Sequence, residues 1–199
     1  MGVVLAGGAG RRLGGGRGAV PSKAATLLAG RPLVSYPLET LAAVCERLAI
    51  VCKHDTRLPA DVGTAERWDE ADEPRHPLNG IVHALERAGE PVLVCAADMP
   101  FVTESVCRAL IAASAGAGSS APRAIATVAV AQGALEPLLA LYAPEALATM
   151  RAASADAPLR ATIATLDPVR VAVPAAVARS VNLREDLDAA ARELGLMAP

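Results

Sequence analysis

The stretch Met1–Lys23 constrains the chain more than any other. Its short apolar run, Val3–Ala6, is too short to be a helix and indicates a buried strand. A glycine-rich loop that also carries arginines, Gly7–Gly18, follows at once, and Lys23 comes after it. Glycine lets the backbone turn sharply and bring its N–H groups close to a ligand, and the cations add fixed positive charge. Because open α/β sheets bind ligands at the carboxyl ends of their strands, the pattern predicts a polyphosphate site.

Two common phosphate loops do not match this stretch. A Walker loop requires Gly-x-x-x-x-Gly-Lys-Ser/Thr, but Lys23 follows Ser22 and precedes Ala24. A dinucleotide fingerprint can be placed only on Gly14–Ala19, which does not follow a strand directly, and Pro21 would interrupt its crossover helix. The Walker loop is therefore excluded, and the dinucleotide fingerprint is disfavoured.

The remaining chain alternates apolar runs with amphipathic helical patterns. This alternation predicts an α/β fold: a single Rossmann-like, three-layer αβα domain, residues 1–199, with a mainly parallel sheet. The Gly-, Ser- and Ala-rich segment Ala115–Pro122 is expected to be a loop within that domain. Strands are expected at Val3–Ala6, Leu48–Cys52, Val62–Ala65 (a weak pattern), Pro91–Cys95, Ala124–Ala131, Leu138–Tyr142 and Val169–Val173, and helices at Val34–Cys45, Ile81–Ala88, Thr103–Ile111, Pro144–Ala153 and Leu187–Leu194.

Composition excludes several classes of function. The net charge of -2 gives no general attraction to nucleic acid. No apolar stretch reaches membrane-spanning length and no signal peptide precedes Val3, so a cytoplasmic protein without membrane partners is expected. The cysteines form no Cys-x-x-Cys pair and lie in apolar surroundings, which predicts reduced core residues. They are Cys45, Cys52, Cys95 and Cys107.

Asp98 is the strongest candidate for a functional residue after the glycine-rich loop. It follows the expected strand Pro91–Cys95, at the edge where the sheet presents ligands. A carboxylate there can hold Mg²⁺, which keeps several waters and needs only one or two protein carboxylates. The alternative is a simple turn at the strand end, which an Asp two residues before Pro100 commonly starts.

The opening stretch resembles the start of the nucleotidyltransferases that make nucleotide-diphosphate-linked sugars and cofactors. Their pattern appears here as Leu5–Gly14, Pro21–Lys23 and Gly30–Leu33. Cys95–Pro100 is similar to the strand and Asp-x-Pro of the same family, whose Asp is a metal ligand. Asp69, Pro77–Ile81 and Val181–Leu187 resemble segments of the MobA-like branch, the molybdenum cofactor guanylyltransferases. The resemblance covers nearly the whole chain and implies a fold of the nucleotide-diphospho-sugar transferase type.

This resemblance implies transfer of a nucleoside monophosphate from a nucleoside triphosphate, GTP being favoured, to a phosphorylated acceptor, with release of pyrophosphate. The acceptor would be molybdenum cofactor. Arg12 and Lys23 would neutralise the triphosphate, and Asp98 would hold Mg²⁺. Asn79, Gly80 and Asn182 are weaker candidates for substrate contacts. The nucleotide-binding residues would be Leu5, Ala6, Gly7, Gly8, Gly10, Lys23, Asp69 and Asp98.

Several alternatives remain open at this point. The base could be cytosine, and the acceptor could be cobinamide phosphate, phospholactate or a sugar phosphate; a non-catalytic nucleotide-binding regulatory protein is the alternative of another class. Asn182 and Glu185 also fit a helix cap, and Asp69 also fits a solvated acidic run. Trp68 fits a packing anchor better than a base-stacking platform. Cys52–His54 replaces the Asn-rich turn of the guanylyltransferases, and Ser22 replaces their Asp before the lysine, which weakens the guanine assignment.

Overall fold

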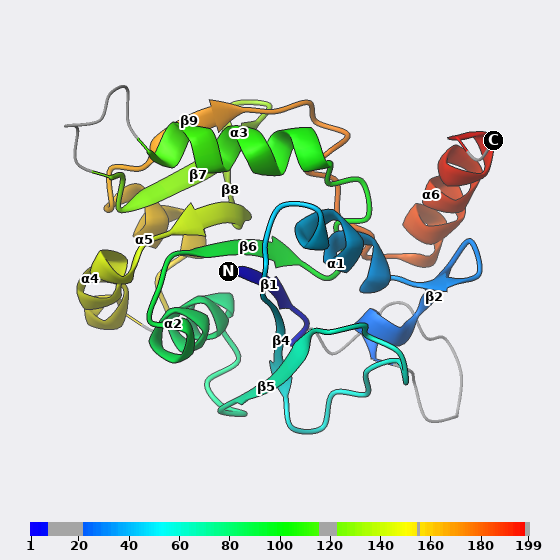
Figure 1. Ribbon diagram of the computed structural model, residues 1–199, viewed down its shortest axis with the longest axis horizontal. Helices are drawn as coiled ribbons and strands as arrows, with labels where there is room; N and C mark the ends of the chain where they lie inside the picture. Colours follow the sequence, from blue (N-terminus) through cyan, green and yellow to red (C-terminus); the bar gives the residue numbers. More distant parts are fainter. Residues whose placement is uncertain (8–21, 116–122, 155, 198–199) are drawn as a thin grey trace.

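A seven-stranded, mostly parallel sheet forms the centre of a single α/β domain (Figure 1). The computed structural model describes residues 1–7, 22–115, 123–154 and 156–197. The strand order is β5-β4-β1-β6-β8-β7-β9. The strands are β1 (Gly2–Leu5), β4 (Leu48–Lys53), β5 (Glu66–Glu70), β6 (Val92–Ala96), β7 (Ala126–Ala131), β8 (Ala134–Tyr142) and β9 (Val169–Ala172), and a separate small hairpin holds β2 (Leu27–Leu28) and β3 (Arg31–Pro32).

Within this sheet, β8 runs against both of its neighbours, β6 and β7, and the other pairs are parallel. The cause is the short connection between β7 and β8. Gln132 and Gly133 both have positive φ, at 50° and 78°, and they join Ala131 to Ala134, which pair directly. Two consecutive residues with positive φ form the tight turn of an antiparallel hairpin. The expected mainly parallel sheet is confirmed.

Helices cover the two faces of the sheet in separate layers. The side chains of β1 alternate between these layers, as the pleat of a strand requires. Val4 packs in one apolar cluster with Leu41 and Leu110, whereas Val3 packs in another with Ile81 and Leu85. The first layer holds α1 (Ser35–Ala42) and α3 (Glu104–Ser114); the second holds α2 (Pro77–Ala88), α4 (Leu147–Ala152) and α5 (Leu159–Ala164). The three-layer arrangement is therefore confirmed.

The last helix, α6 (Arg184–Met197), lies outside both layers, beside the small hairpin (Figure 1). Leu28 and Leu33 from the hairpin region form a third buried cluster with Val181 and Ala190. Two 3₁₀ helices, η1 (Lys23–Ala25) and η2 (Pro144–Ala146), complete the regular elements described.

One predicted strand was wrong. Val62–Ala65 is not a strand; the neighbouring strand is the acidic segment Glu66–Glu70, β5. Only Trp68 and Glu70 of β5 are buried. An edge strand has a neighbour on one side alone, so its outer backbone edge and much of one face are exposed to solvent. Its apolar pattern is therefore too sparse to recognise. Helix α5 and the small hairpin were not predicted, and most of Ala115–Pro122 lies outside the described residues.

The predicted cysteine and tryptophan environments agree with the structure. All four cysteines are free thiols, and Cys52, Cys95 and Cys107 are buried. Trp68 is 1% exposed within the second apolar layer, as expected of a packing anchor. Among the described helices, none has both the length and the apolar character that crossing a membrane requires.

Candidate active site

Four neighbouring strands end around one cavity of about 340 Å³. From β1 the chain first adds β4 and β5 on one side of β1. It then crosses back and adds β6 on the other side, so the strand order reverses at β1. Open α/β sheets bind ligands at such a switch point, beyond the carboxyl ends of the strands. The cavity wall includes one residue at or just after each strand end: Gly7 after β1, Lys53 on β4, Glu70 on β5 and Asp98 after β6.

At one end of the cavity, Lys23 joins two distant parts of the chain. Its Nζ forms an ion pair with Asp98 Oδ2 and donates a hydrogen bond to Asn182 Oδ1 at 2.7 Å. The Lys23 and Asp98 side chains are 14% and 19% exposed, so they remain accessible from the cavity. The backbone N–H of Val181 donates to the Asp98 carbonyl at 2.8 Å, which holds the segment carrying Asn182 against the end of β6.

Asp186 orders the turn that presents Asn182. Its Oδ2 accepts hydrogen bonds from the backbone N–H groups of Asn182 and Leu183, at 2.9 and 2.8 Å. These bonds lower the pKa of the Asp186 carboxyl below its usual value. The capping expected from Asn182 and Glu185 is therefore replaced by Asp186, and the Asn182 side chain is directed to Lys23 instead.

At the other end of the cavity, Lys53 and Glu70 form a buried ion pair. The two residues are direct partners in the parallel register of β4 and β5. Lys53 Nζ lies 3.4 Å from Glu70 Oε1, and the side chains are 3% and 8% exposed. Lys53 Nζ also donates to the carbonyl of Ala71. Glu70 Oε2 is buried and has no hydrogen-bond partner among the residues that the structure describes.

Two glycines leave room for the Glu70 carboxylate. A Cβ at Gly7 would lie 2.8 Å from Glu70 Oε1. At Gly80, a Cβ would lie 3.3 Å from Leu5 Cδ2 and 3.5 Å from Glu70 Oε2. Because the ion pair with Lys53 and burial hold Glu70 in place, a side chain at Gly7 would clash with this carboxylate. The glycine of the opening motif and the glycine of Pro77–Ile81 therefore border the same acidic group.

The structure brings together most of the described residues that were predicted for the site. Leu5, Ala6, Gly7, Lys23, Gly80 and Asp98 line the cavity, and Asn182 contacts Lys23. Asn79 is not part of the cavity wall; its side chain donates to the carbonyl of Pro74 at 2.6 Å. Gly8, Gly10 and Arg12 lie outside the described residues.

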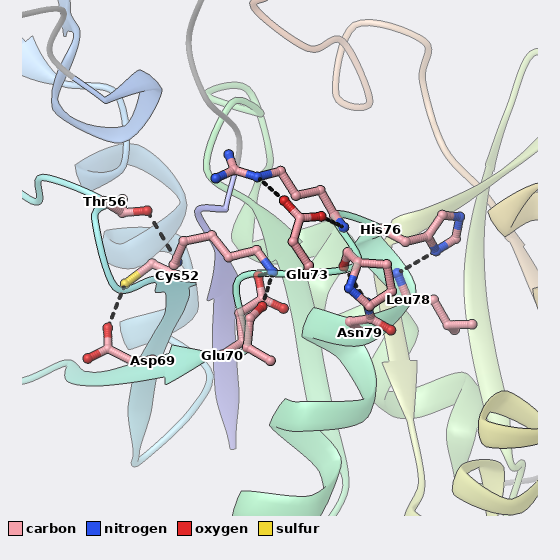
Figure 2. A network of polar contacts seen from close by, with 12 residues as sticks. Cys52, Thr56, Asp69, Glu70, Glu73, His76, Leu78 and Asn79 are labelled. Carbon is pink, nitrogen blue, oxygen red and sulfur yellow. Dashed lines mark hydrogen bonds and ion pairs between the residues drawn. The ribbon is translucent and has the colours of Figure 1, made fainter. Parts of the chain in front are cut away.

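Asp69 does not line the cavity either. Its Oδ1 accepts from Arg67 Nε at 2.8 Å, and this bond is the main reason that the pKa of Asp69 is lowered. Figure 2 shows Asp69 pointing toward Cys52. Glu70 instead forms the ion pair with Lys53, and because consecutive residues of a strand point to opposite faces, the two acidic side chains lie on opposite faces of β5. The acidic residue that β5 contributes to the cavity is therefore Glu70, the neighbour of the predicted Asp69.

Lys53 and Glu70 were not predicted as site residues. The signal that could have indicated Glu70 is its spacing from Trp68: residues two apart on a strand share a face, so an acidic residue two positions after a buried tryptophan faces inward. Lys53 is recognisable only once its pairing with Glu70 is known.

The comparisons with known proteins identify the family of the chain. The sequence profile of the MobA-like NTP transferase domain matches residues 2–170. A molybdenum cofactor guanylyltransferase of Cereibacter sphaeroides is 36% identical over 146 residues, which are 71% of this chain and 68% of that protein. A probable molybdenum cofactor guanylyltransferase of Natronomonas pharaonis is 30% identical over 97% of both chains.

A solved structure is similar over almost its whole length. It is the molybdopterin-guanine dinucleotide biosynthesis protein A of Archaeoglobus fulgidus, with a TM-score of 0.71, 25% sequence identity, and coverage of 99% of this chain and 100% of that one. The resemblance expected from the opening stretch is confirmed. The chain belongs to the family of MobA-like NTP transferase domains and is a nucleotidyltransferase.

Proposed function

We propose that this protein transfers GMP from GTP to molybdenum cofactor and releases pyrophosphate. The observation that carries the proposal is the meeting of Lys23, Asp98 and Asn182 at the switch point of the sheet. This arrangement supplies a cation, a carboxylate and an amide beside the backbone of Gly7. The names of the similar proteins from Cereibacter and Archaeoglobus support guanine as the base and a molybdenum-containing pterin as the acceptor.

In the proposed reaction, a phosphate oxygen of the acceptor attacks the α-phosphorus of GTP. A new oxygen–phosphorus bond forms, the bond from the α-phosphorus to the bridging oxygen breaks, and pyrophosphate leaves with the bonding electrons. Such transfers depend mainly on positioning and on stabilising negative charge, so the protein needs no nucleophile of its own. Lys23 would neutralise the phosphates, and the amides from Ala6 to Gly10 would hold them, with Arg12 as a further cation.

The chemistry of Asp98 fits a bound Mg²⁺. Mg²⁺ prefers oxygen ligands and takes one or two carboxylates, the remaining ligands being waters and substrate phosphates. No cluster of three or more His, Cys, Asp or Glu lies among the described residues, so waters and substrate phosphates would have to complete the coordination of an ion at Asp98. When bound, Mg²⁺ supplies charge stabilisation at phosphate oxygens. Asp98 would hold the ion, and Lys23 would then be released to the triphosphate.

Three further points belong to the proposal. The domain would extend over residues 1–199, beyond the 2–170 matched by the family, because α6 and Val181 pack on the small hairpin in a common apolar cluster.

A cytoplasmic location is supported by the free thiols. Asp69 and Asn79 stay predictions without a contact to the cavity.

The test is a pyrophosphate-release screen of the purified protein. GTP, CTP, ATP and UTP are each combined with Mg²⁺ and with molybdenum cofactor, cobinamide phosphate, phospholactate or a sugar phosphate. We expect release with GTP and molybdenum cofactor and formation of the guanine dinucleotide product. Release with CTP alone would assign a cytidylyltransferase, and no release with any pair would support a nucleotide-binding protein without turnover.

A further inference from the structure

The buried Lys53–Glu70 ion pair has hydrogen-bonding groups that the described residues leave without partners. Both side chains are almost fully buried at the cavity wall, yet Glu70 Oε2 is buried without a hydrogen-bond partner in the part of the chain that the structure describes. An unpaired buried oxygen of a charged group costs free energy, so such atoms are rare in folded proteins unless a ligand or water completes them. A carboxylate oxygen can only accept, so its missing partner is a donor.

Lys53 has unused capacity as well. An ammonium group has three N–H donors, and the contacts of Lys53 Nζ in the described residues are with Glu70 Oε1 and the carbonyl of Ala71. The pair thus holds an acceptor and a donor side by side at the cavity wall. A ligand edge that carries donors next to an acceptor would complete both.

The position of the pair along the sheet identifies the part of a nucleotide that reaches it. Asp98 follows β6 and Glu70 ends β5, and β1 and β4 lie between these strands. Three strand spacings of about 4.8 Å separate them by about 14 Å. With the α-phosphate at Lys23 and Asp98, the ribose lies next to the phosphate, and the base is the part that extends toward Lys53 and Glu70.

Among the common bases, guanine matches this edge best. It presents two adjacent donors, N1–H and the N2 amino group, beside the acceptor O6. Adenine and cytosine place a ring acceptor beside a single amino donor, and uracil places a carbonyl on each side of its one N–H, so each would bring lone pairs against the carboxylate. The Lys53 ammonium faces the same edge and suits O6.

From these contacts we infer that Lys53 and Glu70 select the nucleobase: Glu70 accepts from the N1–H and N2 amino group of guanine, and Lys53 positions Glu70 and donates to O6. This inference rests on the proposed nucleotide site. It gives a specific role to Lys53, which stands where the Asn-rich turn of the similar guanylyltransferases was expected. That replacement therefore favours guanine, contrary to the expectation from the sequence.

The inference is tested by equilibrium binding without acceptor, measured by calorimetry with Mg²⁺. The nucleotides are GTP, ITP, which lacks the N2 amino group, and 2′-deoxyGTP and 3′-deoxyGTP, which each lack one ribose hydroxyl. We expect the wild-type protein to bind GTP roughly tenfold to a hundredfold more tightly than ITP, as for a bidentate base contact. In Glu70→Gln the ratio should fall to within about threefold, while the ratios of GTP to the deoxy nucleotides stay as in the wild type.

Further variants distinguish recognition of the base from a general effect of lost charge and from a loss of folding. Asp72→Asn removes the same charge from an exposed residue two positions further along and should keep the wild-type ratio. Lys53→Met should reduce the GTP:ITP ratio, and Lys53→Arg should restore it in part, because a positioning role needs a cation at that place. Equal wild-type affinity for GTP and ITP counts against the inference even if a variant does not fold.

Equal affinity of the wild-type protein for GTP and ITP would overturn the inference, as would an unchanged ratio in folded Glu70→Gln. Glu70→Gln losing affinity for GTP relative to the deoxy nucleotides would assign Glu70 to the ribose and overturn it too. These results are separate from the proposed function: pyrophosphate release from GTP with equal GTP and ITP binding would leave the function standing. A Glu70-dependent preference for GTP without any release would leave base selection standing.

Discussion

Lys23 and Asp98, 75 residues apart in the sequence, form an ion pair at the mouth of the cavity, and Asn182 accepts a further hydrogen bond from the same ammonium. The cation that would bind phosphate and the carboxylate that would bind Mg²⁺ therefore satisfy each other in this structure. Because each is the other's partner, changing either one alters the electrostatics of both, and their variants should be compared with each other.

Asp98→Asn should remove most of the activity while preserving the fold. The amide has the same shape but no charge, so it holds Mg²⁺ poorly and cannot pair with Lys23 as an ion. We expect pyrophosphate release to fall by roughly 10²–10³-fold, the size of effect seen when one electrostatic group of an active site is removed. Circular dichroism and the thermal midpoint check the fold. Activity within about threefold of wild type would contradict a metal-binding role for Asp98.

Lys23→Ala should weaken GTP binding or slow transfer by roughly 10- to 100-fold, because a charge-assisted contact to phosphate is lost. Single-turnover kinetics with increasing GTP separate the two effects. Arg47→Ala provides the matched control, since Arg47 also forms an ion pair, with Glu90, but on the exposed surface. If Lys23→Ala behaves like Arg47→Ala, then Lys23 does not contact the phosphates.

Asp186→Asn should destabilise the turn before α6, and the effect should depend on pH. The folded-state pKa of Asp186 is lowered by its two backbone hydrogen bonds, so its contribution to stability is fully present above the unfolded-state pKa. It is lost as pH falls through the folded-state value. The difference in free energy of unfolding should be no more than about 1 kcal/mol, because the carboxylate is partly in water.

Urea unfolding at pH 7 and at pH 3 checks this expectation. The wild type and Asp186→Asn should differ at pH 7 and converge as the pH drops toward 3. Equal stability of the two proteins at pH 7 would show that the charge of the Asp186 carboxylate adds nothing to its hydrogen bonds with Asn182 and Leu183.

The parts of the site that could be predicted from sequence are those with local signals. Lys23 follows a glycine-rich loop, and Asp98 directly follows a buried apolar strand, so sheet geometry alone places both at one edge. The parallel sheet was likewise predictable from the alternation of strands and helices. The antiparallel β8 depends on two residues with positive φ, Gln132 and Gly133, and only the second is a glycine.

The parts that were missed depend on pairing between strands or between distant segments. Glu70 lies in an acidic run that resembles a solvated surface, and its spacing from Trp68 is informative only once Glu66–Glu70 is known to be a strand paired with β4. Asn182 was predicted as a weak candidate for a substrate contact, but its local pattern is typical of a helix cap, and its contact with Lys23, 159 positions away, was not predicted. A single sequence carries no information about such contacts until the register is known.

The thiols should be unreactive in the native protein. Burial raises the pKa of Cys52 to about 11 and that of Cys107 to about 12, and Cys95 is raised as well, so little thiolate exists at pH 8. Titration with a disulfide reagent at pH 8 should label none of these three rapidly, whereas guanidinium should expose all four cysteines. Half-buried Cys45 is the internal comparison. Rapid labelling of buried Cys95 in the native protein would contradict the described packing of β6.

Trp68 should be the largest single contributor to the stability of β5 and, through it, to the nucleotide site. Its ring is 1% exposed, its Nε1 donates to Glu66 Oε2 at 2.9 Å, and the Arg87 guanidinium lies 5.1 Å from the ring centre. Trp68→Ala should cost about 3–5 kcal/mol of unfolding free energy, as for a large buried ring, and Trp68→Phe should cost less.

Urea unfolding followed by circular dichroism measures both variants, because the wild type has one tryptophan and its replacement removes the fluorescent probe. Glu66→Gln, which keeps the ring and changes only its hydrogen-bond partner, should cost less than about 1.5 kcal/mol. Since Glu70 lies two residues beyond Trp68 on the same face, Trp68→Ala should also weaken GTP binding more than binding of inorganic pyrophosphate. A loss of less than about 1 kcal/mol in Trp68→Ala would mean that the acidic strand is held in place chiefly by its pairing with β4 and not by this side chain.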